Sequence, residues 1–293
     1  MDKLTFELRS LCKQNKDGSY ATQADRMTQL KLIAIQLKRL GYRNLGVRSL
    51  RTTHVNALVK SWMHGTGSPD HKVSTGTIKN RMAVLRWWAR KINKQNIIPR
   101  TNNALSIPDR KRLPDHNKAF TLSTRQLSAL PRHLNLAARL QQEFGLRREE
   151  AAKFIPSKAI EEDNIQILAT WAKGGRARSI PITTPAQRAL LAELDEAKPN
   201  ASMIPPEYSY RGYLSHRNHF FDKLGIKNAH GLRHRYAQQR YQALTGGLLP
   251  PRMGGKKPSK LTAKEQALDQ KARLVISLEL GHNRLEITRI YLG

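Results

Sequence analysis

The spacing of apolar residues constrains the fold of this chain most strongly. In most patterned segments they recur at every third or fourth position, which is the period of a helix that buries one face. One such stripe carries Leu30, Ile33 and Leu37 and stops at Gly41, and we expect its helix to begin with Thr22 as the cap. The pattern therefore predicts a mainly α fold.

Alternation replaces the helical period in one stretch of the second half. From Ile165 to Trp171 every second residue is apolar, which is typical of a half-buried strand. Residues 173–176 read Lys-Gly-Gly-Arg and predict a turn, and residues 178–182 predict the return strand. We therefore expect a small antiparallel β-sheet inside a mixed, mostly helical C-terminal domain.

The periodicity fades in a basic stretch between about residues 93 and 118. Pro99, Pro108 and Pro114 each interrupt any helix there, so we interpret this stretch as a linker. It divides the chain into a helical N-terminal domain, residues 1–115, and a C-terminal domain, residues 116–293. A length of 293 residues is sufficient for two hydrophobic cores.

Charge is the second constraint, because 52 Lys and Arg residues face 22 Asp and Glu residues, a formal net charge of +30. Residues 1–115 contain 23 basic and 7 acidic residues, and the rest of the chain contains 29 and 15. Both halves are thus expected to contact a polyanion, and nucleic acid is favoured. A membrane surface is disfavoured because the basic residues are spread along the chain instead of forming one amphipathic anchor.

Cysteine content and hydropathy indicate the compartment. Cys12 is the single cysteine, so neither an internal disulfide nor a cysteine-based zinc site can form, which suits a reducing environment. No stretch approaches the roughly 18 apolar residues of a membrane helix. The first residues, Met1 to Leu4, do not begin an apolar signal segment. We therefore expect a cytoplasmic protein with no membrane partner.

A helix with Thr77 as its cap offers a candidate DNA-binding face in the N-terminal domain. The basic residues mostly off its apolar stripe are Lys79, Arg81, Arg86, Arg90 and Lys94. A solvated surface explains this helix alone equally well, and the charge of the whole domain favours phosphate contact. Trp87 and Trp88 on the same helix could stack on bases, but the regular period favours the core.

A set of residues in the C-terminal half has the chemistry needed to move a phosphodiester onto a tyrosine. The set is Arg147, Lys173, His230, Arg233, His282 and Tyr291. Two arginines can hold the non-bridging oxygens as bidentate donors, and Lys173 at a hairpin turn can protonate the leaving 5′ oxygen. His230 precedes Arg233 by three residues and can accept the tyrosine proton or orient the phosphate. Nearby cations make a phenol a usable nucleophile.

These motifs, in this order, resemble the tyrosine recombinases of the phage-integrase family. The matching segments are Gly145–Glu150, Ala172–Pro181, His230–His234 and Leu280–His282, with Tyr291 nine residues after His282. The resemblance spans residues 120–291, and the N-terminal half is similar, more loosely, to the family's helical DNA core-binding domain. It implies a site-specific recombinase, or integrase, that cleaves and rejoins DNA strands through a 3′-phosphotyrosyl intermediate.

The resemblance also implies the surroundings of the reaction. It implies no metal and no nucleotide cofactor, double-stranded DNA with paired recombination sites, and a tetramer on that DNA. A mobile genetic element is the expected source, with accessory DNA-bending proteins as candidate partners. Arg176, in the same hairpin as Lys173, is a further candidate DNA contact.

Two features depart from the family pattern. Arg233 and His282 are 49 residues apart, which is longer than is common, and the excess falls in a Gly/Pro/Lys-rich loop, residues 246–260, and the helix after it. The loop, which its composition predicts to be mobile, is either a contact for DNA or a partner, or a tolerated surface insertion. In the helix capped by Thr262 we expect the buried residues to be Leu268, Ala272, Val275 and Leu278. Two residues follow Tyr291, so its docking in its own subunit or a neighbouring one stays open.

Some residues have competing assignments. Arg148 lies beside Arg147, and we choose Arg147 because it follows Gly-Leu and precedes Glu150 by three residues. His216 and His219 have a spacing that a metal can use, but no acidic or cysteine cluster completes the site, so we expect solvated histidines and no metal.

Other functions account for less of the pattern. A non-catalytic DNA-binding regulator or architectural protein with the same fold is the main alternative, and it would bind DNA without cleaving it. A metal-dependent nuclease or transposase would need an acidic triad, and no convincing one is present. A type IB topoisomerase shares the chemistry but would relax supercoils without a specific site.

Overall fold

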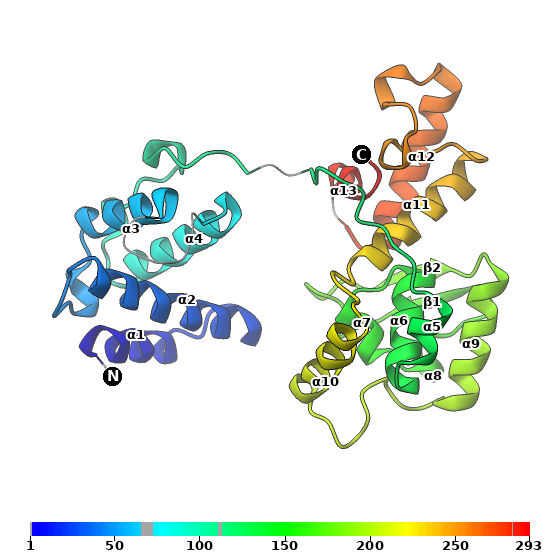
Figure 1. Cartoon of the computed structure of the whole chain (residues 1–293), viewed down its shortest axis with the longest axis horizontal. Coiled ribbons are helices and arrows are strands. Elements are labelled where there is room, and N and C mark those ends of the chain that lie inside the picture. Colours follow the sequence, from blue (N-terminus) through cyan, green and yellow to red (C-terminus); the bar gives the residue numbers. More distant parts are fainter. Residues whose placement is uncertain (1, 66–72, 111–112, 283) are drawn as a thin grey trace. The chain divides into compact units, whose positions relative to one another are not determined.

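The computed structural model describes residues 2–65, 73–110, 113–282 and 284–293. The chain forms two compact units, Met1–Lys111 and Arg112–Gly293, each with its own hydrophobic core (Figure 1). The fold is mainly helical with one two-stranded antiparallel sheet, which confirms the predicted fold class. No helix in the described part of the chain is both long and apolar enough to cross a membrane.

The N-terminal unit is a helical bundle in which α2 contacts α1, α3 and α4. Its elements are α1 (Lys3–Gln14), α2 (Tyr20–Arg39), η1 (Val47–Ser49), α3 (Thr52–His64), α4 (Thr75–Lys91), η2 (Gln95–Ile97) and η3 (Asn103–Leu105). Trp87 and Trp88 are 5% and 1% exposed, so their predicted core position is confirmed. Their indole N–H groups donate to Asp17 Oδ2 (2.8 Å) and the Val47 carbonyl (2.9 Å), which satisfies their polar atoms.

The two helix caps predicted in this unit are wrong by one turn. Ser19 caps α2 and Ser74 caps α4, where the sequence had suggested Thr22 and Thr77. Each serine hydroxyl accepts the backbone N–H of the threonine three residues later and also bonds its hydroxyl, at 3.0 Å and 2.9 Å. The threonines therefore occupy the third helical position, because the serine satisfies the orphan N–H first.

Most of the stretch interpreted as a linker is packed on the N-terminal unit. Ile98 and Ile107 are 3% and 1% exposed in its core. Arg86 donates to the Pro99 carbonyl (3.0 Å) and to Asn102 Oδ1 (2.9 Å). The prolines end the helical pattern, but apolar side chains still anchor the segment that follows.

The C-terminal unit places the β-hairpin among helices. Its elements are α5 (Thr124–Ser128), α6 (Arg132–Phe144), α7 (Arg148–Lys153), α8 (Pro156–Ala159), β1 (Asn164–Ile167), β2 (Arg178–Pro181), α9 (Pro185–Ala197), α10 (Tyr210–Lys223), α11 (Gly231–Thr245), η4 (Pro251–Met253), η5 (Pro258–Lys260), α12 (Ala263–Glu279), η6 (Leu285–Ile287) and α13 (Thr288–Leu292). The strands pair with Ile165 opposite Ile180. Strand β1 ends at Ile167, earlier than predicted, although Trp171 beyond it is still buried.

The buried face of α12 differs from the prediction. Ala272 is buried as expected, but Leu278 is 61% exposed. The buried side carries Asp269 and Arg273, which pair at 2.9 Å, and the Tyr241 hydroxyl donates to Asp269 at 2.7 Å. A buried ion pair can replace apolar side chains in a core, and a hydropathy pattern cannot reveal it.

The loop predicted to be mobile, residues 246–260, has local structure. It contains η4 and η5, and the Gly255 N–H donates to the Pro250 carbonyl at 3.2 Å. Turn η4 contacts α13, the helix that carries Tyr291. The insertion therefore supports the C-terminal segment of the fold.

Candidate active site

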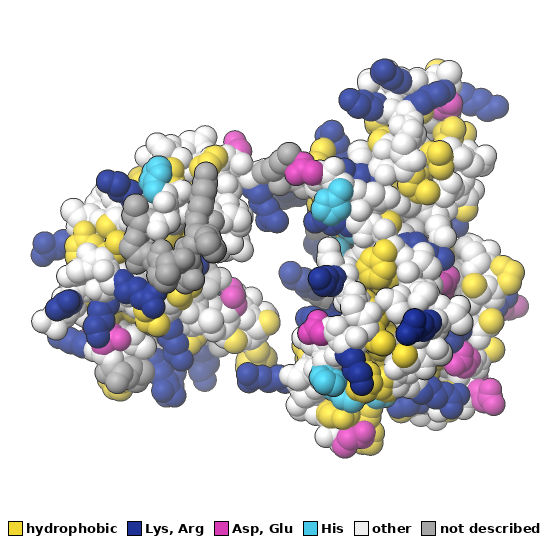
Figure 2. Space-filling model, viewed as in Figure 1, with side chains coloured by type: hydrophobic (Ala, Val, Ile, Leu, Met, Phe, Trp, Pro, Cys, Tyr) yellow, Lys and Arg dark blue, Asp and Glu magenta, His cyan; other side chains and the backbone are white. Residues whose placement is uncertain are grey.

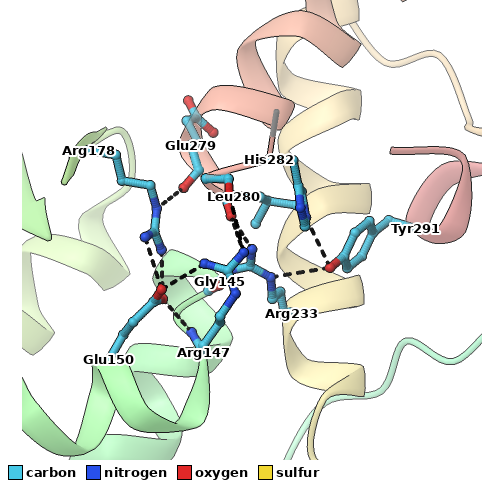
Figure 3. Close-up of polar contacts among 10 residues, drawn as sticks. Gly145, Arg147, Glu150, Arg178, Arg233, Glu279, Leu280, His282 and Tyr291 are labelled. Atoms are coloured by element: carbon cyan, nitrogen blue, oxygen red, sulfur yellow. Dashed lines mark hydrogen bonds and ion pairs between the residues drawn. The ribbon is translucent and has the colours of Figure 1, made fainter. Parts of the chain in front are cut away.

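Helices α7, α11 and α13 and the loop after α12 bring most of the predicted site residues together (Figure 3). Arg147 is the N-cap of α7, and Arg233 lies in the first turn of α11. His282 follows α12 directly, and Tyr291 lies in α13. These residues come from four parts of the chain, so tertiary packing and not local sequence builds the cluster.

Tyr291 lies inside the cluster with its hydroxyl between two predicted partners. Its side chain is 3% exposed. Arg233 Nε donates to the hydroxyl at 3.4 Å, and His282 Nε2 lies 3.3 Å from the same oxygen (Figure 3). The His234 ring packs against the tyrosine ring with centroids 4.6 Å apart. The chain thus holds this tyrosine within its own C-terminal unit.

Arg233 is fully buried and is held by main-chain oxygens. It is 1% exposed, and its two terminal nitrogens donate to the carbonyls of Gly145 and Leu280. Burial lowers the pKa of Arg233 to about 10, and the guanidinium still carries its charge at neutral pH. Gly145 has φ +63°, and a Cβ there would lie 2.4 Å from the Tyr236 ring, so glycine is required where the chain presents this carbonyl.

Arg147 is fixed by the buried Glu150 carboxylate and by the Leu280 carbonyl that also binds Arg233. Its Nη1 donates to Glu150 Oε1 at 2.8 Å, and its Nη2 donates to the Leu280 carbonyl at 3.1 Å. Glu150 is 0% exposed; burial raises its pKa, but the hydrogen bonds and charges of Arg178 and Arg147 outweigh this and bring it to about 2. Both arginines therefore share Leu280 as an anchor, which sets their separation.

The histidines around Tyr291 are neutral at physiological pH. Burial, then the charges of Arg233 and Arg147, lower the pKa of His282 to about 3. Burial and His230 lower the pKa of His234 to about 4, and burial with Arg233 lowers the pKa of His230. A neutral imidazole has one nitrogen free to accept a proton. His230 and His282 each present such a nitrogen to the cluster, and the pKa of about 3 makes His282 a weak base.

Lys173 lies at the edge of the cluster on the exposed turn between β1 and β2. It lines a cavity of about 440 Å³ with Arg147 and His230, and a second cavity of about 280 Å³ with Arg176 and His282. Both cavities open beside the tyrosine cluster. A ligand in either cavity would therefore lie next to Lys173 on the turn between β1 and β2.

The structure also locates the residues with competing assignments. Arg147 lies in the cluster, whereas Arg148 is exposed at the start of α7. His216 is not simply solvated: its ring stacks between His133 and Tyr208, at centroid distances of 5.4 Å and 4.9 Å. His219 is exposed. Across the residues that the structure describes, no three His, Cys, Asp or Glu side chains form a metal-binding group.

The candidate DNA contacts of the N-terminal unit have mixed surroundings. Lys79 pairs with Asp109 (2.9 Å), and Arg81 lies over the Trp62 ring (5.3 Å). Lys94 donates to the Arg48 carbonyl at 2.7 Å, and Arg86 tethers Pro99 and Asn102. Arg90 is exposed, as is Arg176 in the other unit. Basic side chains are scattered over the visible face of both units (Figure 2).

Sequence reasoning missed Arg178 and His234 as members of the site. Arg178 lies on β2 two residues before buried Ile180, so the alternation of a strand places it on the inner face. A charged residue on the inner face of a strand was the signal available for Arg178. His234 follows Arg233 directly, and only the position of α13 brings it to Tyr291.

Known families and structures match this arrangement. A family model for the phage integrase N-terminal domain matches residues 1–98, and an integrase model matches residues 109–239. The solved structure of XerH recombinase bound to a palindromic difH substrate aligns at 17% identity with a TM-score of 0.58, covering 99% of this chain and 81% of that one. A lambda integrase dimer bound to a COC′ core site aligns at 15% identity with a TM-score of 0.60, covering 98% and 77%.

A third solved structure, the Tn1549 transposon integrase with circular intermediate DNA, aligns at 13% identity with a TM-score of 0.58, covering 100% of this chain and 96% of that one. No curated protein matches the chain. At these identities the solved structures establish the fold, and the two family models, one on each unit, identify the domains. The chain belongs to the phage-integrase family of tyrosine recombinases.

Proposed function

We propose that this chain is an integrase that cleaves and rejoins DNA strands at specific sites, with Tyr291 as the nucleophile. The observation that carries the proposal is the position of the Tyr291 hydroxyl, 3.4 Å from Arg233 Nε and 3.3 Å from His282 Nε2, beside Arg147. A buried phenol among guanidinium groups and neutral imidazoles suits attack on a phosphodiester.

In the proposed step, Tyr291 Oη forms a bond to phosphorus and the bond from phosphorus to the 5′ oxygen breaks. The phenolic proton passes to His230 or His282, and the leaving 5′ oxygen takes a proton from Lys173. The product is a 3′-phosphotyrosyl link and a free 5′ hydroxyl. Attack by a 5′ hydroxyl on that link reverses the step and rejoins DNA without a nucleotide cofactor.

Arg147 and Arg233 would neutralise the charge that develops on the non-bridging oxygens. A guanidinium carries five N–H hydrogens. Arg147 donates through Nη1 to Glu150 and through Nη2 to the Leu280 and Gly281 carbonyls, so one hydrogen on Nη1 and the hydrogen on Nε would serve phosphate. Arg233 donates once from each nitrogen, so each of its terminal nitrogens retains one hydrogen. The shared Leu280 anchor would hold both donors in place before DNA arrives, which lowers the reorganisation cost of the reaction.

The partner proposed for both units is double-stranded DNA that carries paired recombination sites. Arg90 and Arg176 are exposed and can contact DNA phosphates directly. The positive potential of the N-terminal unit would attract DNA through the other candidates, Lys79, Arg81, Arg86 and Lys94. We place the reaction in the cytoplasm, on a tetramer, for a mobile genetic element and with accessory DNA-bending proteins as candidate helpers.

Covalent capture tests the proposal. A recombination site can be selected from a random duplex library by its detergent-stable link to the protein, and then rebuilt with a nick that prevents rejoining. We expect the wild type to form this adduct and Tyr291→Phe to form none, because the phenol supplies the nucleophilic oxygen. An unchanged adduct in Tyr291→Phe would overturn the assignment.

The same assay separates the alternative functions. A regulator or architectural protein would bind the library without forming an adduct. A metal-dependent nuclease would lose cleavage in excess chelator, whereas we expect the adduct to persist. A topoisomerase would relax any supercoiled plasmid, whereas we expect relaxation only of plasmids that carry the selected site.

A further inference from the structure

Arg178 is a buried arginine that is absent from the predicted catalytic set. It lies on β2, five residues after Lys173, and its side chain is 6% exposed. Its terminal nitrogens make two bonds to Glu150, at 3.0 Å and 2.7 Å, and its Nε donates to the Glu279 carbonyl at 2.7 Å (Figure 3). One side chain thus joins the hairpin to α7 and to the end of α12.

The charge balance around Glu150 depends on Arg178. The Glu150 carboxylate also accepts the Arg147 backbone N–H at 2.7 Å and Arg147 Nη1 at 2.8 Å. One negative charge therefore faces two guanidinium groups, which leaves one positive charge in excess. If Arg178 were absent, Arg147 alone would neutralise the buried Glu150 carboxylate, and no excess positive charge would remain for the phosphate.

The position of Arg178 also aligns the elements that carry the other groups. The Glu279 carbonyl that it binds directly precedes Leu280, whose carbonyl accepts from both Arg147 and Arg233. The same arginine sits on the strand that leads back from the turn bearing Lys173. Its contacts therefore connect the proposed proton donor to the two proposed phosphate-binding arginines.

We propose that Arg178 is a positioning residue for strand cleavage: it neutralises Glu150, so that the charge of Arg147 is available to the scissile phosphate, and it ties the Lys173 hairpin to the arginine cluster. This inference rests on the proposed function. The three nitrogens of Arg178 donate to Glu150 and to the Glu279 carbonyl, so its effect on the reaction passes through Arg147 and Lys173.

The first test is Arg178→Met on the nicked site, with single-turnover adduct formation as the readout. We expect cleavage to slow by about 10- to 100-fold, the range seen when a positioning contact is lost, with DNA affinity little changed. Arg139→Met is the matched control, because Arg139 pairs with Glu193 in the same unit away from the cluster. It should cleave like the wild type. Equal rates for Arg178→Met and the wild type would overturn the proposal.

A charge rescue separates positioning from simple structural support. Arg178→Met with Glu150→Gln removes both members of the pair and restores the excess positive charge, so it should cleave faster than Arg178→Met alone. Arg178→Lys, which retains the charge, should also exceed Arg178→Met. A double variant no faster than the single one would contradict the electrostatic role. Arg178→Gln replaces Arg178→Met if thermal unfolding shows that the methionine variant does not fold.

A neutral substrate gives an independent readout. A methyl group in place of one non-bridging oxygen of the scissile phosphate removes the charge that Arg147 is proposed to neutralise. The ratio of wild-type to Arg178→Met rates should then shrink by about tenfold, because the substrate no longer carries the charge whose neutralisation the variant impairs. An unchanged ratio would count against action through Arg147. Wild-type adduct formation in the same experiments reports on the proposed function separately.

Discussion

The two units use the same kind of side chain in opposite ways. In the N-terminal unit, Arg86 and Lys94 each donate to a carbonyl of their own unit, and Arg90 faces solvent. In the C-terminal unit, Arg147 and Arg233 converge on one carbonyl, with buried Glu150 beside them. Dispersed cations give attraction to a polyanion, whereas convergent cations give a place for one phosphate.

Convergence has an energetic cost that dispersal does not have. Like charges in a buried cluster repel, and burial removes their hydration. The C-terminal unit offsets this with a carboxylate that is 0% exposed and with main-chain oxygens that accept from the guanidinium groups. The comparison indicates that the site is preorganised for an anion before the anion binds.

The largest expected effect comes from Arg233→Met. We expect adduct formation to fall by about 10²- to 10³-fold, because one donor to the developing charge is lost. The carbonyls of Gly145 and Leu280 would also lose a buried partner, so the C-terminal unit should unfold at lower temperature. Cleavage rates and thermal unfolding measure the two effects. Arg86→Met as a control should leave the rate of bound complexes nearly unchanged, and an equal loss there would break the contrast between the units.

A smaller effect should separate two arginines on the same helix. Arg86→Met removes bonds to Pro99 and Asn102 and should lower the free energy of unfolding of the N-terminal unit by about 1 kcal/mol. Arg90→Met should spare stability and reduce the slope of log affinity against log salt by about 1, because an exposed cation meets phosphate. Denaturant unfolding and salt titrations of DNA binding distinguish them. Identical salt slopes for Arg86→Met and Arg90→Met would contradict the distinction between a cation that tethers the fold and one that faces solvent.

The smallest effect is the pH dependence of the C-terminal unit. His234 and His282 have folded pKa values of about 4 and about 3, below the ordinary 6.5, so the unfolded chain binds more protons between these values. Stability is therefore full above pH 6.5 and falls as the pH is lowered. We expect the Tm to drop by a few degrees between pH 7 and pH 5, where carboxylates titrate little. His282→Asn should flatten this slope; an equally steep slope would contradict the burial of a neutral imidazole.

The sequence predicts the helical fold and the hairpin well because both depend on period. It predicts the wrong N-cap where two capping residues lie one turn apart. Ser19, and not Thr22, caps α2, and Ser74, and not Thr77, caps α4. On α12 it fails because the Asp269–Arg273 pair occupies the buried face and Leu278 faces solvent. In each case the deciding interaction is a hydrogen bond, which hydropathy does not measure.

For the site, the order of motifs predicts which residues converge, and the hairpin turn predicts that Lys173 is exposed. The sequence does not predict the groups that hold these site residues in place, because those groups are backbone atoms or side chains in segments without a distinctive pattern. Leu280 belongs to one of the motifs that match the family, yet its carbonyl accepts from two arginines. Side-chain identity does not reveal which carbonyl a distant guanidinium will find.

That dependence on carbonyl oxygens has an evolutionary consequence. The anchors of Arg147, Arg178 and Arg233 include the main-chain oxygens of Gly145, Glu279 and Leu280, and every amino acid supplies such an oxygen. A codon change at position 279 or 280 alters the side chain but cannot delete the acceptor. The arginine scaffold is thus buffered against side-chain changes at positions 279 and 280, whereas Gly145 remains fixed because a Cβ there would meet Tyr236. Drift at the buffered positions can change the side chain while the backbone path keeps the cluster aligned.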